Sequence, residues 1–242
     1  MKLGKLPPRL DPRTLRMARY MTPELPPPPA AVDWTRGMGD DFGMMLNDRI
    51  GCCTCSTPGH MVQVFSAANG ARIDIPDAAI LKAYKDVSGY DGTDESDRGA
   101  VVLDVLRYWK NVGIGGHKIL GFAAVDLKNR IHTMQAIHVF GGIYLGASLP
   151  ESIDRQETWR VDLGDAGDGR ASLGGHAFSA HSYDEHGPRG ITWARRQPTT
   201  WPFLDAYSDE AFVVVSEEWA DANGAPSGFD RDQLLADIRA VS

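Results

Sequence analysis

The chain has 242 residues, of which 43% are hydrophobic and 24% are charged, and this is enough apolar sequence for a substantial core. The formal net charge of −7 argues against nucleic acid or an anionic membrane as the main partner. All three cysteines lie between positions 52 and 55. They cannot form a disulfide framework, and they indicate a reducing compartment.

The first 32 residues form a segment of their own, with proline pairs at 7–8 and a run of four at 26–29. This composition predicts a proline-rich extended arm with one short helix over 14–21. The arm is basic at its start and lacks an apolar segment behind the charges, which argues against a signal peptide. We expect a cytoplasmic or particle-associated protein. Its arm either lies on its own surface, where it could cover a functional cleft, or docks on a neighbouring subunit.

Residues 33–242 are expected to form one two-lobed domain, with a mainly helical part over 33–116 and a mainly β part over 117–242. Apolar residues recur at helical spacing over 77–90 and 100–111, and again over 229–241 at the end of the chain. Runs rich in Ile, Val, Phe and Tyr predict strands at 118–125, 135–145, 157–161, 175–183, 190–193 and 211–216. Helices early and strands late indicate an α+β fold.

The stretch from Asn47 to His60 carries the cysteines and runs from a polar loop into a more regular apolar segment. This order places Cys53 at the start of a helix, where the helix dipole stabilises a thiolate. Pro58 falls inside that helix and should cost one backbone hydrogen bond. A reactive cysteine at this position would also have backbone amides nearby to hold an oxyanion.

A base for such a cysteine is expected in the stretch from Gly174 to Asp184. His176 follows two glycines there, and a turn at 184–188 predicts a hairpin that brings His176 near Thr192. His181 is the alternative, but its odd offset places it on the opposite face of the strand.

Two other readings of the cysteines remain open. Cys52, Cys53, Cys55 and His60 form a Cys3His set, although their spacing does not match common zinc sites. Cys52 and Cys55 also form a Cys-x-x-Cys pair, but without the βαβ context of a redox site. The acidic loop at 89–98 lacks the spacing of a calcium-binding loop and is expected to be solvated. We therefore predict no metal and no cofactor.

The chain resembles a divergent papain-like cysteine peptidase, possibly one encoded by a phage or prophage. In that family a glutamine precedes the nucleophilic cysteine by six residues and a glycine by two, where this chain has Asn47 and Gly51 before Cys53. The family's Gly-His-Ala-like strand matches Gly175 to Ala177. Its Asn-Ser-Trp-Gly motif matches the stretch from 191 to 194, with Thr192 in place of the asparagine and Trp193 as the tryptophan.

The resemblance implies a hydrolase that cleaves peptides or proteins through a Cys53–His176 thiolate–imidazolium pair. Thr192 would orient the imidazole, Trp193 would shield that bond, and Asn47 with the Cys53 amide would hold the oxyanion. The substrate pocket is expected to include Ile137, Phe140 and Trp201. The alternative is a structural protein with the same fold and little or no catalysis, in an assembly such as a phage particle.

Overall fold

A seven-stranded antiparallel sheet forms the centre of the computed structural model, which describes residues 2–162, 173–216 and 229–240. The strand order is β2-β7-β3-β4-β5-β6, and the short β1 pairs with β4. The strands are β1 (Val32–Asp33), β2 (Ile119–Ala124), β3 (Ile143–Leu149), β4 (Gly174–Tyr183), β5 (Pro188–Thr192), β6 (Arg195–Pro198) and β7 (Ser208–Ser216).

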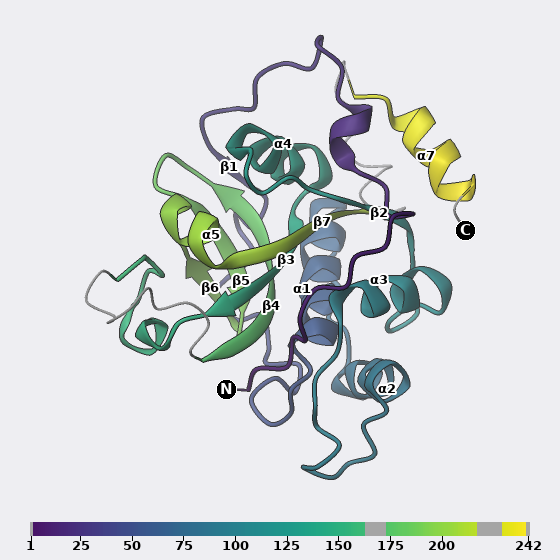
Figure 1. Cartoon of the computed structure of the whole chain (residues 1–242), viewed down its shortest axis with the longest axis vertical. Coiled ribbons are helices and arrows are strands. Elements are labelled where there is room, and N and C mark those ends of the chain that lie inside the picture. Colours follow the sequence, from purple (N-terminus) through teal and green to yellow (C-terminus); the bar gives the residue numbers. More distant parts are fainter. Residues whose placement is uncertain (1, 163–172, 217–228, 241–242) are drawn as a thin grey trace.

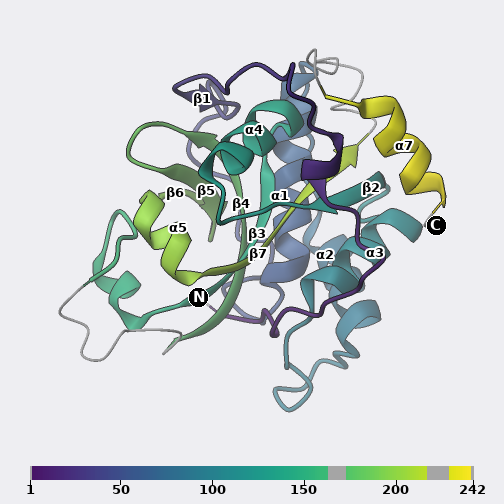
Figure 2. The ribbon, with the colours of Figure 1, turned by 45° about the horizontal axis from the view of Figure 1, so that its top comes forward.

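Helices cover both faces of this sheet (Figures 1 and 2). Successive side chains of a strand point to opposite faces, so Ile143 and Leu145 of β3 lie in one core cluster, and Tyr144 between them lies in the other. The first cluster includes α4 (Arg130–Phe140) and α5 (Trp201–Tyr207), and the second includes α1 (Cys53–Ala68), α2 (Asp77–Ser88) and α3 (Val102–Asn111). Two short 3₁₀ helices, η1 (Met17–Tyr20) and η2 (Glu151–Arg155), and the last helix α7 (Arg231–Ala240) complete the described elements.

Helix α1 is the most enclosed element, since every residue from Cys53 to Ser66 is buried. It continues through Pro58, whose missing N–H leaves the carbonyl of Thr54 without its usual helical donor. The hydroxyl of Tyr144 on β3 donates to that carbonyl at 2.5 Å. The sheet thus supplies the hydrogen bond that the proline removes.

The predicted α+β layout is confirmed, as are the helices near 77–90, 100–111 and 229–240 and four of the six strands; position 241 lies outside the described residues. The strand predicted at 135–145 is wrong, because residues up to Phe140 belong to α4. Asn129 caps α4 by accepting from two backbone amides, and buried Thr133, Ala136, Ile137 and Phe140 follow a helical repeat.

The strand predicted at 157–161 is also wrong. This stretch forms a single bridge between Trp159 and Thr199. Trp193 and Trp201 are both buried. None of the described helices is long and apolar enough to cross a membrane.

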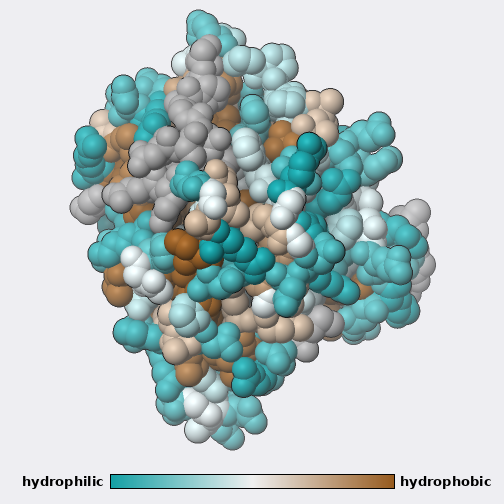
Figure 3. All heavy atoms as spheres, turned by 180° about the vertical axis from the view of Figure 1, so that it is seen from behind, coloured by the Kyte–Doolittle hydropathy of each residue, from teal (hydrophilic) through white to brown (hydrophobic). Residues whose placement is uncertain are grey.

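The N-terminal arm packs along its own chain (Figure 2). Met17 and Tyr20 of η1 are buried, and the Tyr20 hydroxyl donates to Asp237 of α7 at 2.8 Å. Farther on, the carbonyls of Pro26 and Pro29 accept hydrogen bonds from the side chains of Gln135 and Tyr183. The face of the molecule turned away from the view of Figure 1 mixes hydrophilic and hydrophobic residues (Figure 3).

Candidate active site

Cys53 is the first residue of α1 and is only 1% exposed. The backbone amides of Ala177 on β4 and Gly4 in the arm lie close enough to its sulfur to lower the pKa of the thiol. Burial raises the pKa of the Cys53 thiol to about 11, although these amides oppose the shift. In this arrangement the sulfur is a neutral thiol at ordinary pH, and it lies beside the residue that follows His176.

His176 lies on β4 and is fully buried. Its Nε2 is 2.7 Å from the hydroxyl of Thr192, and its ring stacks on Trp193 with centroids 4.2 Å apart and planes 21° apart. Among the described residues, no group hydrogen-bonds to its Nδ1. Burial lowers the pKa of His176 to about 3, with a smaller contribution from His60, so the imidazole is neutral.

The hairpin expected between His176 and Thr192 is present, with β4 and β5 paired around a turn at 184–187. Because Nε2 is held by Thr192, the ring can present only Nδ1 to a second group. The geometry therefore gives Thr192 contact with the imidazole and leaves one ring nitrogen available for proton transfer.

The alternative histidine makes different contacts. His181 Nδ1 lies 2.6 Å from the carbonyl of Gly141, and its ring meets Phe65 edge-on. His60 lies on α1, where its Nδ1 is 3.1 Å from the side chain of Gln63. Neither makes the contact with Thr192 that holds His176.

Asn47 precedes Cys53 in the loop that leads to α1 and is 2% exposed. Its amide Nδ2 donates to the carbonyl oxygens of Lys2 at 3.0 Å and Ile50 at 3.3 Å. The side chain thus already donates to a backbone carbonyl of the arm. An oxyanion-hole donor must likewise donate to the carbonyl oxygen of a peptide backbone.

The acidic loop before α3 is mostly exposed, as expected for a solvated loop, but its Asp97 holds this region in place. The side chain of Asp97 is only 5% exposed and accepts from the Gly51 amide at 2.9 Å and the Tyr84 hydroxyl at 2.6 Å. It also forms an ion pair with Lys2 at 3.1 Å. Burial opposes the shift, but these donors together lower the pKa of Asp97.

Residues 2–6, which we call the N-terminal segment, lie across Cys53. The amides of Gly4 and Lys5 both donate to the carbonyl of Gly175 on β4, at 3.2 and 3.0 Å. On the other side, Gly4 and Leu6 exchange backbone hydrogen bonds with Ala100, at 2.8 and 3.0 Å. The segment is therefore bonded both to β4 and to the loop before α3, and its purple trace passes between the strands and α3 in Figure 1.

Glycines allow this close approach. A Cβ on Gly4 would lie 1.7 Å from the carbonyl oxygen of Gly51, and one on Gly175 would lie 2.0 Å from that of Lys5. Real Cβ atoms do not approach that closely, so both positions need glycine while the segment is in place. The walls around Cys53 are thus shaped to receive an extended backbone.

The other two cysteines are buried packing residues. Cys52 lies 3.4 Å from the Met45 carbonyl and from the Ser56 hydroxyl, and burial raises the pKa of both Cys52 and Cys55. All three cysteines are free. No group of three or more His, Cys, Asp or Glu side chains in the described part of the chain is arranged to hold a metal ion.

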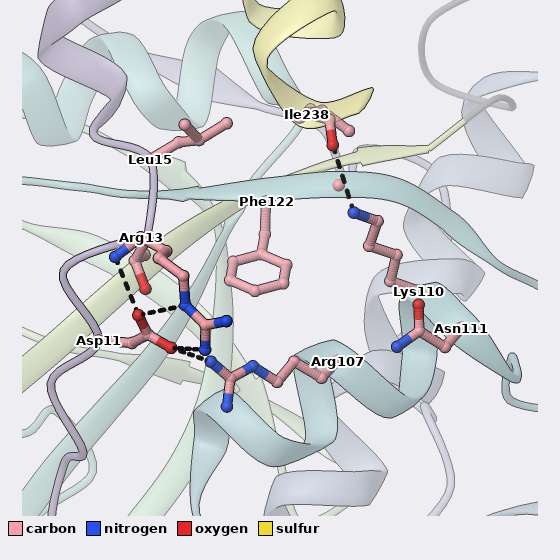
Figure 4. Close-up of a pocket in the computed structure, with 10 residues that line it drawn as sticks. Asp11, Arg13, Leu15, Arg107, Lys110, Asn111, Phe122 and Ile238 are labelled. Carbon is pink, nitrogen blue, oxygen red and sulfur yellow. Dashed lines mark hydrogen bonds and ion pairs between the residues drawn. The ribbon is translucent and has the colours of Figure 1, made fainter. Parts of the chain in front are cut away.

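A surface pocket between the arm, α3 and α7 has a different character (Figure 4). Asp11 of the arm accepts from Arg13 and from Arg107 of α3, and Phe122 and Lys110 line the space beside them. These contacts hold the arm on α3. None of the three cysteines and no histidine lines this pocket, so it is separate from the Cys53 site.

The residues expected to line the substrate pocket lie in the hydrophobic core. Ile137 and Phe140 lie on α4 and Trp201 on α5, all within one hydrophobic core cluster. Ile137 and Phe140 therefore belong to a helix and not to the strand predicted at 135–145. A part for these three residues in substrate binding stays a prediction.

Comparison of the sequence with protein-family models and with curated proteins gives no match. Solved structures give clear matches and show that the chain has a divergent papain-like fold. Xylellain, a cysteine protease from Xylella fastidiosa, superposes with a TM-score of 0.68 at 15% identity, over 88% of this chain and 96% of xylellain.

Two further structures agree. The Carica candamarcensis cysteine protease CMS1MS2, solved in complex with E-64, has a TM-score of 0.56 at 14% identity and covers 78% of this chain and 99% of its own. Digestive procathepsin L 3 of Tenebrio molitor has a TM-score of 0.60 at 12% identity and covers 88% of this chain and 75% of its own.

Proposed function

We propose that the chain is a latent cysteine peptidase, with Cys53 as nucleophile and His176 as its base. The observation that carries this proposal is the state of the His176 ring. Thr192 holds Nε2, Trp193 fixes the plane, and Nδ1 has no hydrogen-bond partner among the described residues. The next amide of the same strand, that of Ala177, lowers the pKa of the Cys53 thiol. A packing histidine needs no such arrangement.

The proposed reaction begins when the N-terminal segment leaves the cleft. His176 takes the Cys53 proton on Nδ1, and the thiolate attacks the carbonyl carbon of a peptide bond. The Cys53 amide and the Asn47 side chain donate to the oxyanion. The C–N bond breaks as His176 gives its proton to the leaving amine. Water, deprotonated by His176, then releases the acid product and restores the thiol.

Latency is proposed because the N-terminal segment covers the sulfur. With residues 2–6 in place, Cys53 is 1% exposed and its thiol pKa is about 11, so little thiolate exists to react. In this proposal residues 1–32 form an arm that regulates the domain over 33–242. The substrates would be peptides or proteins.

A structural role is the second candidate. Threonine at 192 is a poorer partner for an imidazole than the asparagine of papain-like enzymes, and no hydrogen bond joins Cys53 to His176 among the described residues. Under this reading the protein is a component of an assembly such as a phage particle, and the arm binds a neighbouring subunit. The papain-like fold would then be retained without turnover.

The test is labelling with the epoxide E-64 followed by mass-spectrometric mapping of the modified cysteine. The full chain is compared with Gly4→Val and with Gly4→Val combined with His176→Ala. The valine side chain would collide with the backbone of Gly51 and should displace the N-terminal segment from Cys53. Selective labelling of Cys53 in the first variant, lost in the second, supports the peptidase. Absence of Cys53 labelling in both would favour the structural role.

A further inference from the structure

The side chain of Lys5 leaves the N-terminal segment and enters the protein beside Cys53. It is only 1% exposed, which is rare for lysine unless the charge is paired. Its ammonium lies 2.8 and 2.9 Å from the two carboxylate oxygens of Asp209 and 3.4 Å from that of Glu210. The Leu6 carbonyl is also near, at 3.3 Å.

The two carboxylates converge because of a bulge in β7. Gly146 of β3 pairs with Glu210, but the next residue of β3, Ala147, pairs with Ser208, which leaves Asp209 as an extra residue. Neighbouring side chains of a regular strand point to opposite faces. A bulge relaxes this rule and redirects a side chain, so Asp209 and Glu210 can reach the same ammonium group.

Gly146 leaves space for a long side chain to reach Asp209 and Glu210. A Cβ at this position would lie 2.2 Å from Cε of Lys5 and 2.7 Å from Cγ of Glu210. Any larger residue would close the passage to a long side chain. The pocket is therefore a narrow channel for an unbranched stem, with two carboxylates at its end.

The channel opens next to the reactive groups. The amides of Gly4 and Lys5 both donate to the carbonyl of Gly175, the residue before His176, and the Gly4 amide is close enough to the Cys53 sulfur to lower the pKa of the thiol. A backbone that lies over Cys53 thus places an adjacent side chain in this pocket.

We propose that this pocket is a specificity site for a lysine or arginine side chain of the peptide substrate, and that Lys5 fills it while the cleft is covered. This inference rests on the proposed peptidase function and names the substrate class. The Lys5 ammonium hydrogen-bonds to Asp209 and forms an ion pair with Glu210, and the ammonium or guanidinium group of a substrate would make the same charged contacts. An apolar stem would leave Glu210, whose side chain is 8% exposed, without a positive partner.

The surroundings of the pocket favour a cation. Burial raises the pKa of Glu210 to about 7, against the opposing effect of Lys5, so the acid is costly to ionise without a positive partner. The Ser148 hydroxyl donates to Asp209 at 3.2 Å. Both acids also line a surface cavity together with Asp126, Asp205 and Lys128, which gives that cavity a net negative charge.

Binding tests the pocket without requiring catalysis. The protein is the full chain carrying Gly4→Val and Cys53→Ala, and the ligands are acetyl-Leu-Gly-X-Leu-amide peptides with X as lysine, norleucine or glutamate, measured by calorimetry. Norleucine keeps the stem and lacks the ammonium. We expect the lysine peptide to bind at least about tenfold more tightly than norleucine, and Asp209→Asn with Glu210→Gln to remove that difference.

Turnover tests the substrate class separately. With Cys53 intact, peptide libraries in which one position at a time is varied should give higher kcat/KM for lysine and arginine at one position. A lysine preference in binding without turnover would keep the pocket and refute the peptidase. Two results would overturn the pocket, each in protein whose folding is verified by circular dichroism. One is equal binding of the lysine and norleucine peptides. The other is that neither the Gly4→Val nor the Lys5→Glu protein binds either peptide.

Discussion

The backbone amide of Gly4 donates to the carbonyl of Gly175, the residue before His176, at 3.2 Å. The same amide lowers the pKa of the Cys53 thiol, so a residue from the start of the chain lies beside the candidate nucleophile. Because Lys5 donates to the same carbonyl, the same few residues cover the thiol, the strand of His176 and the acidic pocket. Exposure of Cys53 should therefore depend on whether the N-terminal segment is in place.

The first prediction concerns the pH profile of Cys53 alkylation by iodoacetamide. In the full chain the Cys53 thiol pKa is about 11, so alkylation should rise only at strongly alkaline pH. Gly4→Val should admit water and lower this pKa by two units or more. A lower pKa means more thiolate at fixed pH, so the rate near pH 7.5 should rise about 100-fold.

Leu10→Ala is the matched control, because Leu10 lies in the same arm and is 94% exposed. Its profile should equal that of the unchanged chain. If Gly4→Val leaves the profile where it was, the N-terminal segment does not control access to Cys53.

Local motifs made much of the candidate site predictable. The contact between His176 and Thr192 follows from a hairpin whose two strands and turn are adjacent in the sequence, so local sequence patterns predict it. Lys5 could not be found in this way, because lysine is normally exposed and its burial depends on Asp209 and Glu210, far along the chain. Helix α4 was missed because its β-branched and aromatic residues also suit a strand, and only packing on the sheet decides between the two.

The second prediction concerns Thr192 in the Gly4→Val background. Thr192→Val keeps the shape but removes the hydroxyl that lies 2.7 Å from His176 Nε2. The imidazolium formed during reaction would then lack its partner, and the rate of Cys53 alkylation near neutral pH should fall about tenfold or more.

Thr192→Ser supplies the comparison, since it retains a hydroxyl at the same position. It should keep most of the rate. Equal rates for the valine and serine variants would show that Thr192 does not assist His176.

The third prediction concerns stability at mildly acidic pH. Burial lowers the pKa of His176 to about 3 and those of His60 and His181 to about 4, whereas unfolded histidine titrates near 6.5. Below that value the unfolded chain binds more protons, so the free energy of unfolding should fall as pH falls. Glu210 acts in the opposite direction, because its pKa is raised to about 7 in the folded protein.

Between about pH 5 and 6, these three histidines against one glutamate leave a net difference of about two protons, or roughly 2.7 kcal/mol per pH unit. Burial also lowers the pKa of His138, which adds to the slope in the same direction. Urea unfolding at several pH values measures this slope. His60→Gln should reduce it by about one proton. A slope that does not change in this variant would mean that His60 is not buried in its neutral form.

The fourth prediction concerns the hydrogen bond from the Tyr144 hydroxyl to the Thr54 carbonyl of helix α1. Tyr144→Phe removes the hydroxyl that donates to Thr54 and leaves a buried carbonyl without a partner, at a cost of about 1–3 kcal/mol. Pro58→Ala restores a backbone N–H that can donate to the same carbonyl. Tyr144→Phe should therefore cost less in the Pro58→Ala background than in the unchanged chain. A double-mutant cycle by urea unfolding measures this coupling. Strictly additive effects would show that Pro58 and Tyr144 do not share Thr54, and that α1 tolerates the proline for another reason.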